Sequence, residues 1–132
     1  MRARGRVIAR GVASGEVLLS SEPISFLGGV DARSGKVVEP GHPLFGKSVA
    51  GKVLVFPRGK GSTVGTYVIY QLKKNGAAPV AIINEEAEII VAVGAIISEI
   101  PMLDKLEAGG YEMLKNGMKV KVDAEKGFVE EA

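Results

Sequence analysis

The stretch KVLVFPRGKGSTVGTYVIYQLKKNGAAPVAIIN, residues 52–84, decides the fold class of this 132-residue chain. It holds two short apolar runs, 52–56 and 79–84, separated by a glycine-rich loop and a segment with apolar residues at helical spacing. Continuous apolar runs of this length are typical of strands that are buried on both faces. The apolar residues at helical spacing are Val64, Tyr67, Val68 and Leu72. Ser62 is placed to cap this helix and Gly76 to follow its end, so the stretch predicts a βαβ-type unit.

Upstream of this unit, the short apolar runs 7–9 and 17–19 predict strands around a turn at Gly15. Between them and the unit lies the loop-rich segment 20–51. A loop of that length in so small a domain is usually functional.

Downstream, the segment EEAEIIVAVGAIISEIPML is ambiguous between strand and helix by composition. We interpret it as a helix over roughly 86–97, interrupted or bent near Gly94, followed by a short strand around 100–103. The apolar residues that share one face of this helix are Ile89, Val93, Ile96 and Ile97. A short helix near 106–115 and strands at 118–122 and 128–130 complete the prediction, which is a single mixed α/β domain over residues 1–132.

Composition excludes several classes of function. The chain has no cysteine and one histidine, His42, which we expect in a surface loop. Disulfides, thiolate catalysis and a cysteine-ligated metal within the chain are therefore ruled out, and a Ser–His–Asp site nearly so. No apolar run is long enough to span a bilayer and no secretory leader is visible, so we expect a soluble, cytoplasmic protein without membrane contact.

Charge is unevenly distributed along the chain. Residues 1–60 carry ten Lys and Arg against four Asp and Glu, a net charge of +6, whereas residues 61–132 carry seven against eleven, a net charge of −4. A basic half can attract an anionic small molecule. Nucleic-acid binding would also need aromatic platforms, and aromatic residues make up only 5% of the chain, so we do not expect a nucleic-acid partner.

The sharpest local motif is the loop PRGKGSTVG, residues 57–65, between a predicted buried strand and a predicted helix. Its glycines let backbone N–H groups approach a ligand, and the helix start adds partial positive charge, so the loop is expected to bind an anion. It matches neither the Walker A nor the Rossmann pattern. Ser62 can be a helix cap or a hydroxyl held ready for deprotonation, and Arg58 and Lys60 can be solvated charges or partners of a carboxylate or phosphate.

A second glycine-rich motif is PISFLGGVD, residues 23–31. Gly28 and Gly29 permit close backbone approach or positive φ, while Ser25 and Asp31 supply polar groups. Read locally, the motif is a tight turn whose continuation is capped by Asp31.

Together these stretches resemble the small subunit of the aconitase X family. The resemblance is carried by the sequence from Ser25 to Leu72, followed by APVAIIN and VGAIISEIP, and it covers nearly the whole chain. It implies the aconitase swivel fold, a single β/β/α domain. It also implies a heterodimer in which a cysteine-bearing large subunit holds a [4Fe–4S] cluster, with none of the cluster's ligands on this chain.

The resemblance implies a dehydration reaction in the archaeal mevalonate pathway, from (R)-5-phosphomevalonate to trans-anhydromevalonate 5-phosphate. The serine at the family's proton-acceptor position is Ser62. By the same resemblance, Ser25, Gly28, Gly29 and Asp31 would line the pocket for the anionic substrate, together with Arg58, Lys60 and Gly61. Two alternatives stay open: a related dehydratase acting on another hydroxy acid, and a swivel domain without catalysis.

Overall fold

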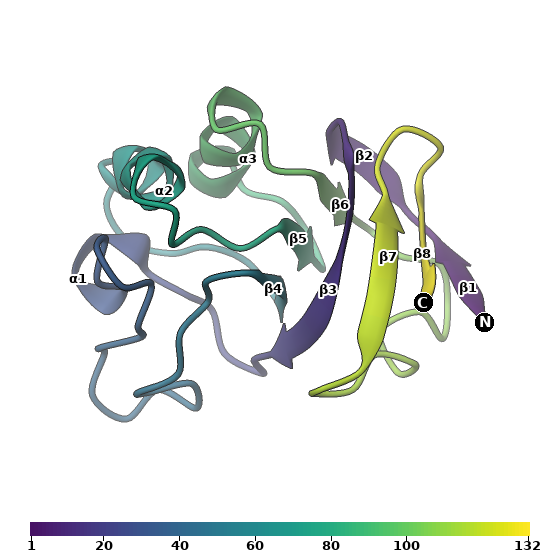
Figure 1. Cartoon of the computed structure of the whole chain (residues 1–132), viewed down its shortest axis with the longest axis horizontal. Helices are drawn as coiled ribbons and strands as arrows, with labels where there is room; N and C mark the ends of the chain where they lie inside the picture. The colour runs from purple at the N-terminus through teal and green to yellow at the C-terminus, as the bar shows by residue number, and fades with distance from the viewer.

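The computed structural model describes all residues, 1–132, and contains eight strands and three helices (Figure 1). In chain order the elements are β1 (Arg2–Arg4), β2 (Arg6–Ala9), β3 (Val12–Leu19), α1 (Phe26–Gly29), β4 (Lys52–Phe56), α2 (Gly65–Lys74), β5 (Ala81–Asn84), α3 (Ile89–Ile97), β6 (Met102–Asp104), β7 (Lys119–Asp123) and β8 (Phe128–Glu131). No helix has the length and apolar character that crossing a membrane requires.

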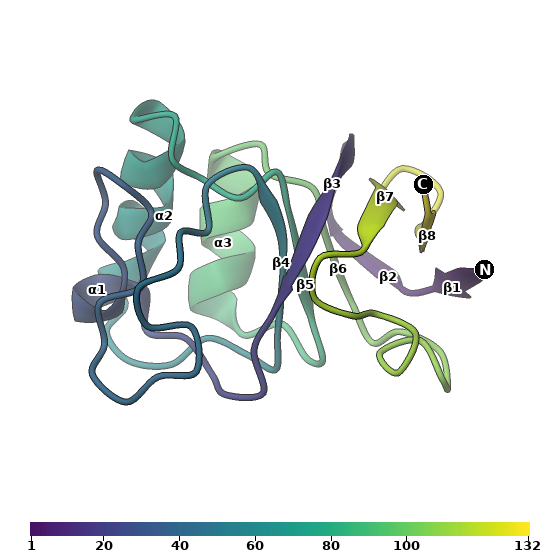
Figure 2. The same ribbon diagram turned by 60° about the horizontal axis from the view of Figure 1, so that its bottom comes forward.

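All eight strands belong to one sheet in the order β1-β8-β7-β3-β4-β5-β6-β2. β3, β4, β5 and β6 are parallel neighbours, and the pairs that involve β1, β2, β7 and β8 are antiparallel. β1 and β2 are at opposite ends of this order, yet only Gly5 separates them in the chain. The sheet must therefore curl round on itself, which brings its two ends together (Figures 1 and 2).

The curled sheet has an apolar core on each side of β4. Val53 and Val55 point into the core enclosed by the sheet, and Leu54 and Phe56 point into the core beneath the helices. All four residues are at most 2% exposed. The three helices lie together on the outer side of the sheet (Figure 1), so two β layers and one helical layer form the predicted β/β/α swivel domain.

The βαβ prediction is confirmed: β4, α2 and β5 follow in order, and β4 and β5 pair in parallel. The buried face of α2 differs from the prediction, because Gly65, Ile69 and Leu72 are buried. Tyr67, which we expected on that face, is 66% exposed.

Three other local predictions are wrong. Gly15 does not form a turn but lies inside β3 opposite Val120, and the reversal of the chain occurs at Gly11, whose φ is +140°. The segment 106–115 forms turns and no helix. The helix near Gly94 is not interrupted: Gly94 lies inside α3, where a Cβ would come within 2.7 Å of Ile69 Cδ1, so the glycine allows α2 and α3 to pack closely.

A partly buried ion pair joins β2 to its neighbour β6 at one end of the strand order: the Arg6 side chain is half exposed and the Asp104 side chain is fully buried. Arg6 donates two hydrogen bonds to Asp104, at 2.9 and 2.8 Å, and the Ala87 N–H donates a third at 2.7 Å. Burial raises the pKa of the Asp104 carboxyl, but these hydrogen bonds and the charge of Arg6 outweigh it and leave the pKa below its ordinary value. The ion pair thereby fixes the turn between β5 and α3 to the edge of the sheet.

We expect Asp104→Ala to lower the free energy of unfolding at pH 7 by about 2 kcal/mol, because the partly buried Ala87 N–H loses its acceptor and Arg6 loses its ion-pair partner. A lowered folded-state pKa stabilises the fold fully above the unfolded value of about 3.9, and this stabilisation is lost as the pH falls through the folded-state pKa. Urea unfolding of wild type and variant should therefore converge as the pH falls from 5 to about 2. Glu130→Ala, which breaks the surface pair with Arg2, is the control and should cost less than about 1 kcal/mol.

Candidate functional site

The two glycine-rich motifs lie side by side in the structure, although 25 residues, 32–56, separate them in the chain. Ile24 and Gly59 form a parallel bridge. The Ile24 N–H donates to the Arg58 carbonyl oxygen at 3.2 Å, and the Lys60 N–H donates to the Ile24 carbonyl oxygen at 3.0 Å. Residues 23–31 and 57–65 therefore form one surface, which we call the double loop.

Ser25 and Gly61 meet at the centre of the double loop. Gly61 has φ +90°, and a Cβ on it would lie 2.6 Å from Ser25 Oγ. The Ser25 hydroxyl donates to the Leu27 carbonyl oxygen at 3.0 Å, which fixes its position. Only glycine combines this backbone conformation with so close an approach, so the structure brings these two predicted site residues together.

Ser62 is exposed, next to Gly61, in the turn that precedes α2. The prediction that it caps the helix needs correction: α2 begins at Gly65, its N-cap residue is Val64, and no side chain caps it. Ser62 Oγ instead accepts a hydrogen bond from the Val64 N–H at 3.1 Å within the preceding turn. The hydroxyl is thus oriented by the backbone and remains open to a ligand.

Three consecutive backbone N–H groups at and beside Ser62 are free. The N–H groups of Gly61, Ser62 and Thr63 have no hydrogen-bond acceptor in the chain. Successive free N–H groups at a turn form an anion-binding concavity, and the start of the ten-residue helix α2 adds partial positive charge. Free donors and a helix start at this position make negative charge favourable near Ser62.

The two cations of the double loop differ in their surroundings. Arg58 is exposed and forms no ion pair or side-chain hydrogen bond. Lys60 Nζ lies 3.3 Å from Glu39 Oε2, and Glu39 in turn lies against Gly29, where a Cβ would be 3.4 Å from its Oε1. Sequence reasoning missed Glu39, because its pairing with Lys60 joins residues 21 positions apart and no local pattern marks it.

The end of β5 and the residues that follow it hold the start of the 57–65 loop. Asn84 Nδ2 donates to the Phe56 carbonyl oxygen at 3.0 Å. The Glu85 and Glu86 N–H groups both donate to the Pro57 carbonyl oxygen, at 3.0 and 3.3 Å. Asn84 is completely buried. The loop therefore leaves the sheet at a fixed angle.

α3 supports the same loop from the side. A Cβ on Gly59 would contact Glu88 Oε1 and would lie 2.5 Å from Val91 Cγ2. Glu88 caps α3 by accepting hydrogen bonds from the Ile90 and Val91 N–H groups, at 2.9 and 2.8 Å. Gly59 thus allows the loop to rest directly on the start of α3, a role that we did not assign from the sequence.

The remaining predicted site residues are Gly28, Gly29 and Asp31. Asp31 accepts hydrogen bonds from the Ser34 hydroxyl at 2.8 Å and the Arg33 N–H at 3.3 Å, which lower the pKa of its carboxyl. No hydrogen bond joins Asp31 to residues 57–65, so its carboxylate closes its own turn. Gly28 is exposed with φ +82° and open space around it, and Gly29 is buried.

His42 is buried, not in an exposed loop as expected. Its Nδ1 accepts a hydrogen bond from the Leu44 N–H at 3.0 Å, and its Nε2 lies 3.1 Å from the Pro23 carbonyl oxygen. This geometry requires a neutral ring with the proton on Nε2, which then donates to Pro23. His42 therefore anchors the first residue of the double loop.

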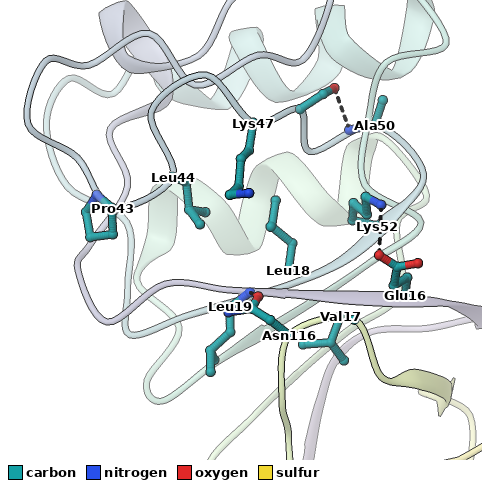
Figure 3. Close-up of a pocket in the computed structure, with 12 residues that line it drawn as sticks. Glu16, Val17, Leu18, Leu19, Pro43, Leu44, Lys47, Ala50, Lys52 and Asn116 are labelled. Carbon is teal, nitrogen blue, oxygen red and sulfur yellow. Dashed lines mark hydrogen bonds and ion pairs between the residues drawn. The ribbon is translucent and has the colours of Figure 1, made fainter.

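The largest hollow of the chain, about 580 Å³, lies away from the double loop (Figure 3). It is lined by the end of β3, residues 43–52 and Asn116–Gly117, and it includes none of the predicted site residues. At its rim Lys52 Nζ pairs with Glu16 Oε1 at 3.3 Å. The candidate site is thus an open surface of donors and cations that the largest hollow of the chain does not enclose.

Comparisons with known proteins agree on one family. A family model described as the aconitase X swivel domain matches residues 2–131. The chain is 65% identical over 130 residues to the phosphomevalonate dehydratase small subunit of Methanosarcina acetivorans, covering 98% of this chain and 90% of that one. It is 59% identical to the protein of the same name from Thermococcus kodakarensis, covering 98% and 96%.

A solved structure shows the same fold. The crystal structure of Thermococcus kodakaraensis aconitase X in its holo-form superposes with a TM-score of 0.94 at 57% identity. The alignment covers 100% of this chain and 98% of the matched chain.

We expect Gly61→Ala and Ser25→Ala to be energetically coupled, because the new Cβ would meet Ser25 Oγ. Gly61→Ala should destabilise the wild-type chain by about 1 kcal/mol more than it destabilises the Ser25→Ala chain. Urea unfolding of the four proteins in this cycle measures the coupling. Gly46→Ala has a similar positive φ and open space around it, and it should show no coupling to Ser25→Ala. Additive effects of Gly61→Ala and Ser25→Ala would contradict the packing of the double loop.

Proposed function

Because the chain belongs to the aconitase X swivel-domain family, we propose that it is the small subunit of a two-subunit hydro-lyase that dehydrates (R)-5-phosphomevalonate to trans-anhydromevalonate 5-phosphate. The similarity to proteins named phosphomevalonate dehydratase small subunit, over nearly the full length of both chains, supports this activity. The observation that carries the catalytic assignment is the exposed Ser62 hydroxyl among free backbone donors.

In this proposal Ser62 is the proton acceptor. A serine alkoxide removes a proton from the carbon next to the substrate carboxylate, and the hydroxyl on the neighbouring carbon leaves. An alkoxide is far too basic to persist in water, so it needs donors that are already oriented. The Val64 N–H already donates to Ser62 Oγ, and the free N–H groups at 61–63 and the start of α2 make negative charge favourable there.

The cations of the double loop would bind the anionic ends of the substrate. Arg58 has no partner in the chain and offers a planar pair of donors that suits a carboxylate or phosphate. Lys60 can exchange Glu39 for a substrate anion, since the pair is partly exposed. The wall of the substrate site would be formed by Ser25, Gly28, Gly29 and Gly61. Asp31 would contribute by holding its turn, because both of its carboxylate oxygens are already hydrogen bonded.

The iron–sulfur cluster that the family implies does not fit the residues of this chain. The chain has no cysteine, and no group of three or more His, Cys, Asp or Glu is arranged to hold a metal ion. We assign the [4Fe–4S] cluster to a cysteine-bearing large subunit, where it would supply a Lewis acid for the leaving hydroxyl. The small subunit would then supply the base and part of the anion site.

We expect Ser62→Ala, assayed with the large subunit and an intact cluster, to lower kcat by about 10²–10⁴-fold, because a general base is lost. The free energy of unfolding should change by less than about 1 kcal/mol, since Ser62 is exposed and does not cap α2. Ser48→Ala is the control: it removes a partly exposed serine outside the double loop whose hydroxyl donates to the Ser34 carbonyl oxygen and accepts from the Ala50 N–H, and it should keep kcat. A Ser62→Ala enzyme with near-wild-type kcat would remove Ser62 from the mechanism.

We expect the isolated small chain, reconstituted with iron and sulfide under reducing conditions, to retain neither, because it has no thiolate ligands. The complex with the large subunit should retain a cluster under the same conditions. Iron and sulfide analysis with absorption spectra measures both. Stoichiometric iron and sulfide on the isolated chain would contradict this division.

The substrate assignment is tested separately with the assembled wild-type enzyme. Dehydration of (R)-5-phosphomevalonate should exceed that of other hydroxy acids, such as hydroxyproline and malate-type compounds. If the enzyme prefers one of those compounds, the substrate assignment is wrong and the assignment of a dehydration reaction is kept.

A further inference from the structure

The strongest unexplained feature of the surface is an apolar face on α2 and α3. Seven of the twelve exposed large hydrophobic residues of the chain are on these two helices and the turn before α2. They are Tyr70 and a group of six: Val64, Tyr67, Ile89, Val93, Ile96 and Ile97. We call this group of six the helical face. The other five are scattered over the N-terminus, β3, α1 and the loop between α1 and β4, and they are Met1, Val12, Leu27, Val38 and Phe45.

α3 is apolar on all sides. Its sequence, IIVAVGAII, contains no charged or hydrogen-bonding side chain. One side, with Val91, Gly94 and Ala95, is buried against the rest of the domain. A helix that is hydrophobic all round is ordinarily buried all round, but here Ile89 is 73% exposed and Ile96 is 54% exposed. The sequence of α3 therefore fits a helix that is covered on its outer side as well.

A groove between the two helices forms the middle of the helical face. It has a volume of about 370 Å³ and is lined by Thr63, Val64, Thr66, Tyr67, Ile89, Ile90 and Val93. The Thr66 hydroxyl donates to the Ile90 carbonyl oxygen at 2.8 Å, so these two polar groups are already satisfied. The groove can therefore receive an apolar side chain without leaving either group unpaired.

The helical face is continuous with the double loop. Thr63 and Val64, which line the groove, follow Ser62 directly in the chain. If Ser62 acts on a substrate held at the large subunit's cluster, the surface beside Ser62 must meet that subunit. Glu85, Glu86, Lys73 and Lys74 are exposed near the ends of the two helices, which gives the apolar face the charged rim of a protein interface.

We propose that the helical face is the principal docking surface for the large subunit, and that an aliphatic or aromatic side chain of that subunit fills the groove between α2 and α3. This inference rests on the proposed function, because that function places Ser62 against the large subunit. An apolar face of this kind suits a permanent complex better than a transient one.

The test measures the affinity of the purified small chain for the large subunit, not turnover. The test variant is the double substitution Ile89→Glu/Ile96→Lys. Its acidic residue is at the start of α3 and its basic residue near the end, which is the arrangement that the helix dipole favours. The two substitutions together leave the net charge of the chain unchanged. We expect the dissociation constant to rise at least tenfold. Phe45→Lys is the control: Phe45 is 58% exposed, in the loop between α1 and β4 and outside both helices of the helical face, and its replacement should change the dissociation constant less than twofold.

Fold is checked on each isolated variant by circular dichroism and urea unfolding. If the double variant does not fold, Ile96→Ser alone is used in the same titration. Unchanged affinity of a folded variant overturns the inference. Self-association of the wild-type chain that the double variant abolishes, with large-subunit affinity unchanged, would assign the helical face to a second copy and would also overturn it.

The inference and the proposed function fail in different ways. If the wild-type complex dehydrates the substrate and the double variant binds the large subunit normally, the proposed function is supported and the proposed docking surface is contradicted. If the complex depends on the helical face but dehydrates none of the compounds, the docking surface is supported and the proposed function is contradicted. Ser62→Ala should bind the large subunit as tightly as wild type in this titration.

Discussion

The burial of β4 on both faces is the constraint on which the rest of the structure depends. Four consecutive side chains, Val53 to Phe56, alternate between the core inside the sheet and the core beneath the helices. Because neither face can shift without exposing apolar surface, the register of β4 against β3 and β5 is fixed. The point at which the chain leaves the sheet, at Pro57, is then fixed as well.

The chemistry of the double loop follows from that fixed exit. The Phe56 and Pro57 carbonyl oxygens are held by Asn84 and by the backbone after β5. The loop is therefore supported at its start by the sheet, while its glycines let it lie against both Ser25 and α3. What remains free is a row of N–H groups around an exposed hydroxyl. A preorganised site of this kind needs few side chains of its own, because the backbone supplies most of the donors.

The parts of the fold that depend on local sequence were predictable. The strands β4 and β5 and the loop between them carry strong signals in apolar runs, glycine and proline. The exposed side of α3 could not be identified, because all of its residues are apolar and no polar side marks the surface. The turns at 106–115 resemble a helix in composition, yet Leu106 and Leu114 pack into the core inside the sheet. In that segment tertiary packing outweighs local propensity.

The site was predictable in its loops and not in its supports. Glycine pairs and the position of Ser62 marked both loops, and the structure shows that the loops touch. Asn84, Glu39 and Glu88 contact them from distant parts of the chain, and each looks in sequence like an ordinary strand end or surface charge. His42 shows the same limit, because its burial depends on a contact with Pro23, 19 residues away.

The curled sheet also determines the order in which the chain can fold during its synthesis. β1 pairs only with β8, so Arg2 finds its partner, Glu130, at the other end of the sequence. β2 likewise waits for β6, almost one hundred residues later. The βαβ unit, in contrast, can assemble from residues that leave the ribosome close together. The strands β1 and β2 therefore remain unpaired on a nascent chain until β8 and β6 have been synthesised, and ring closure of the sheet is a late event in folding.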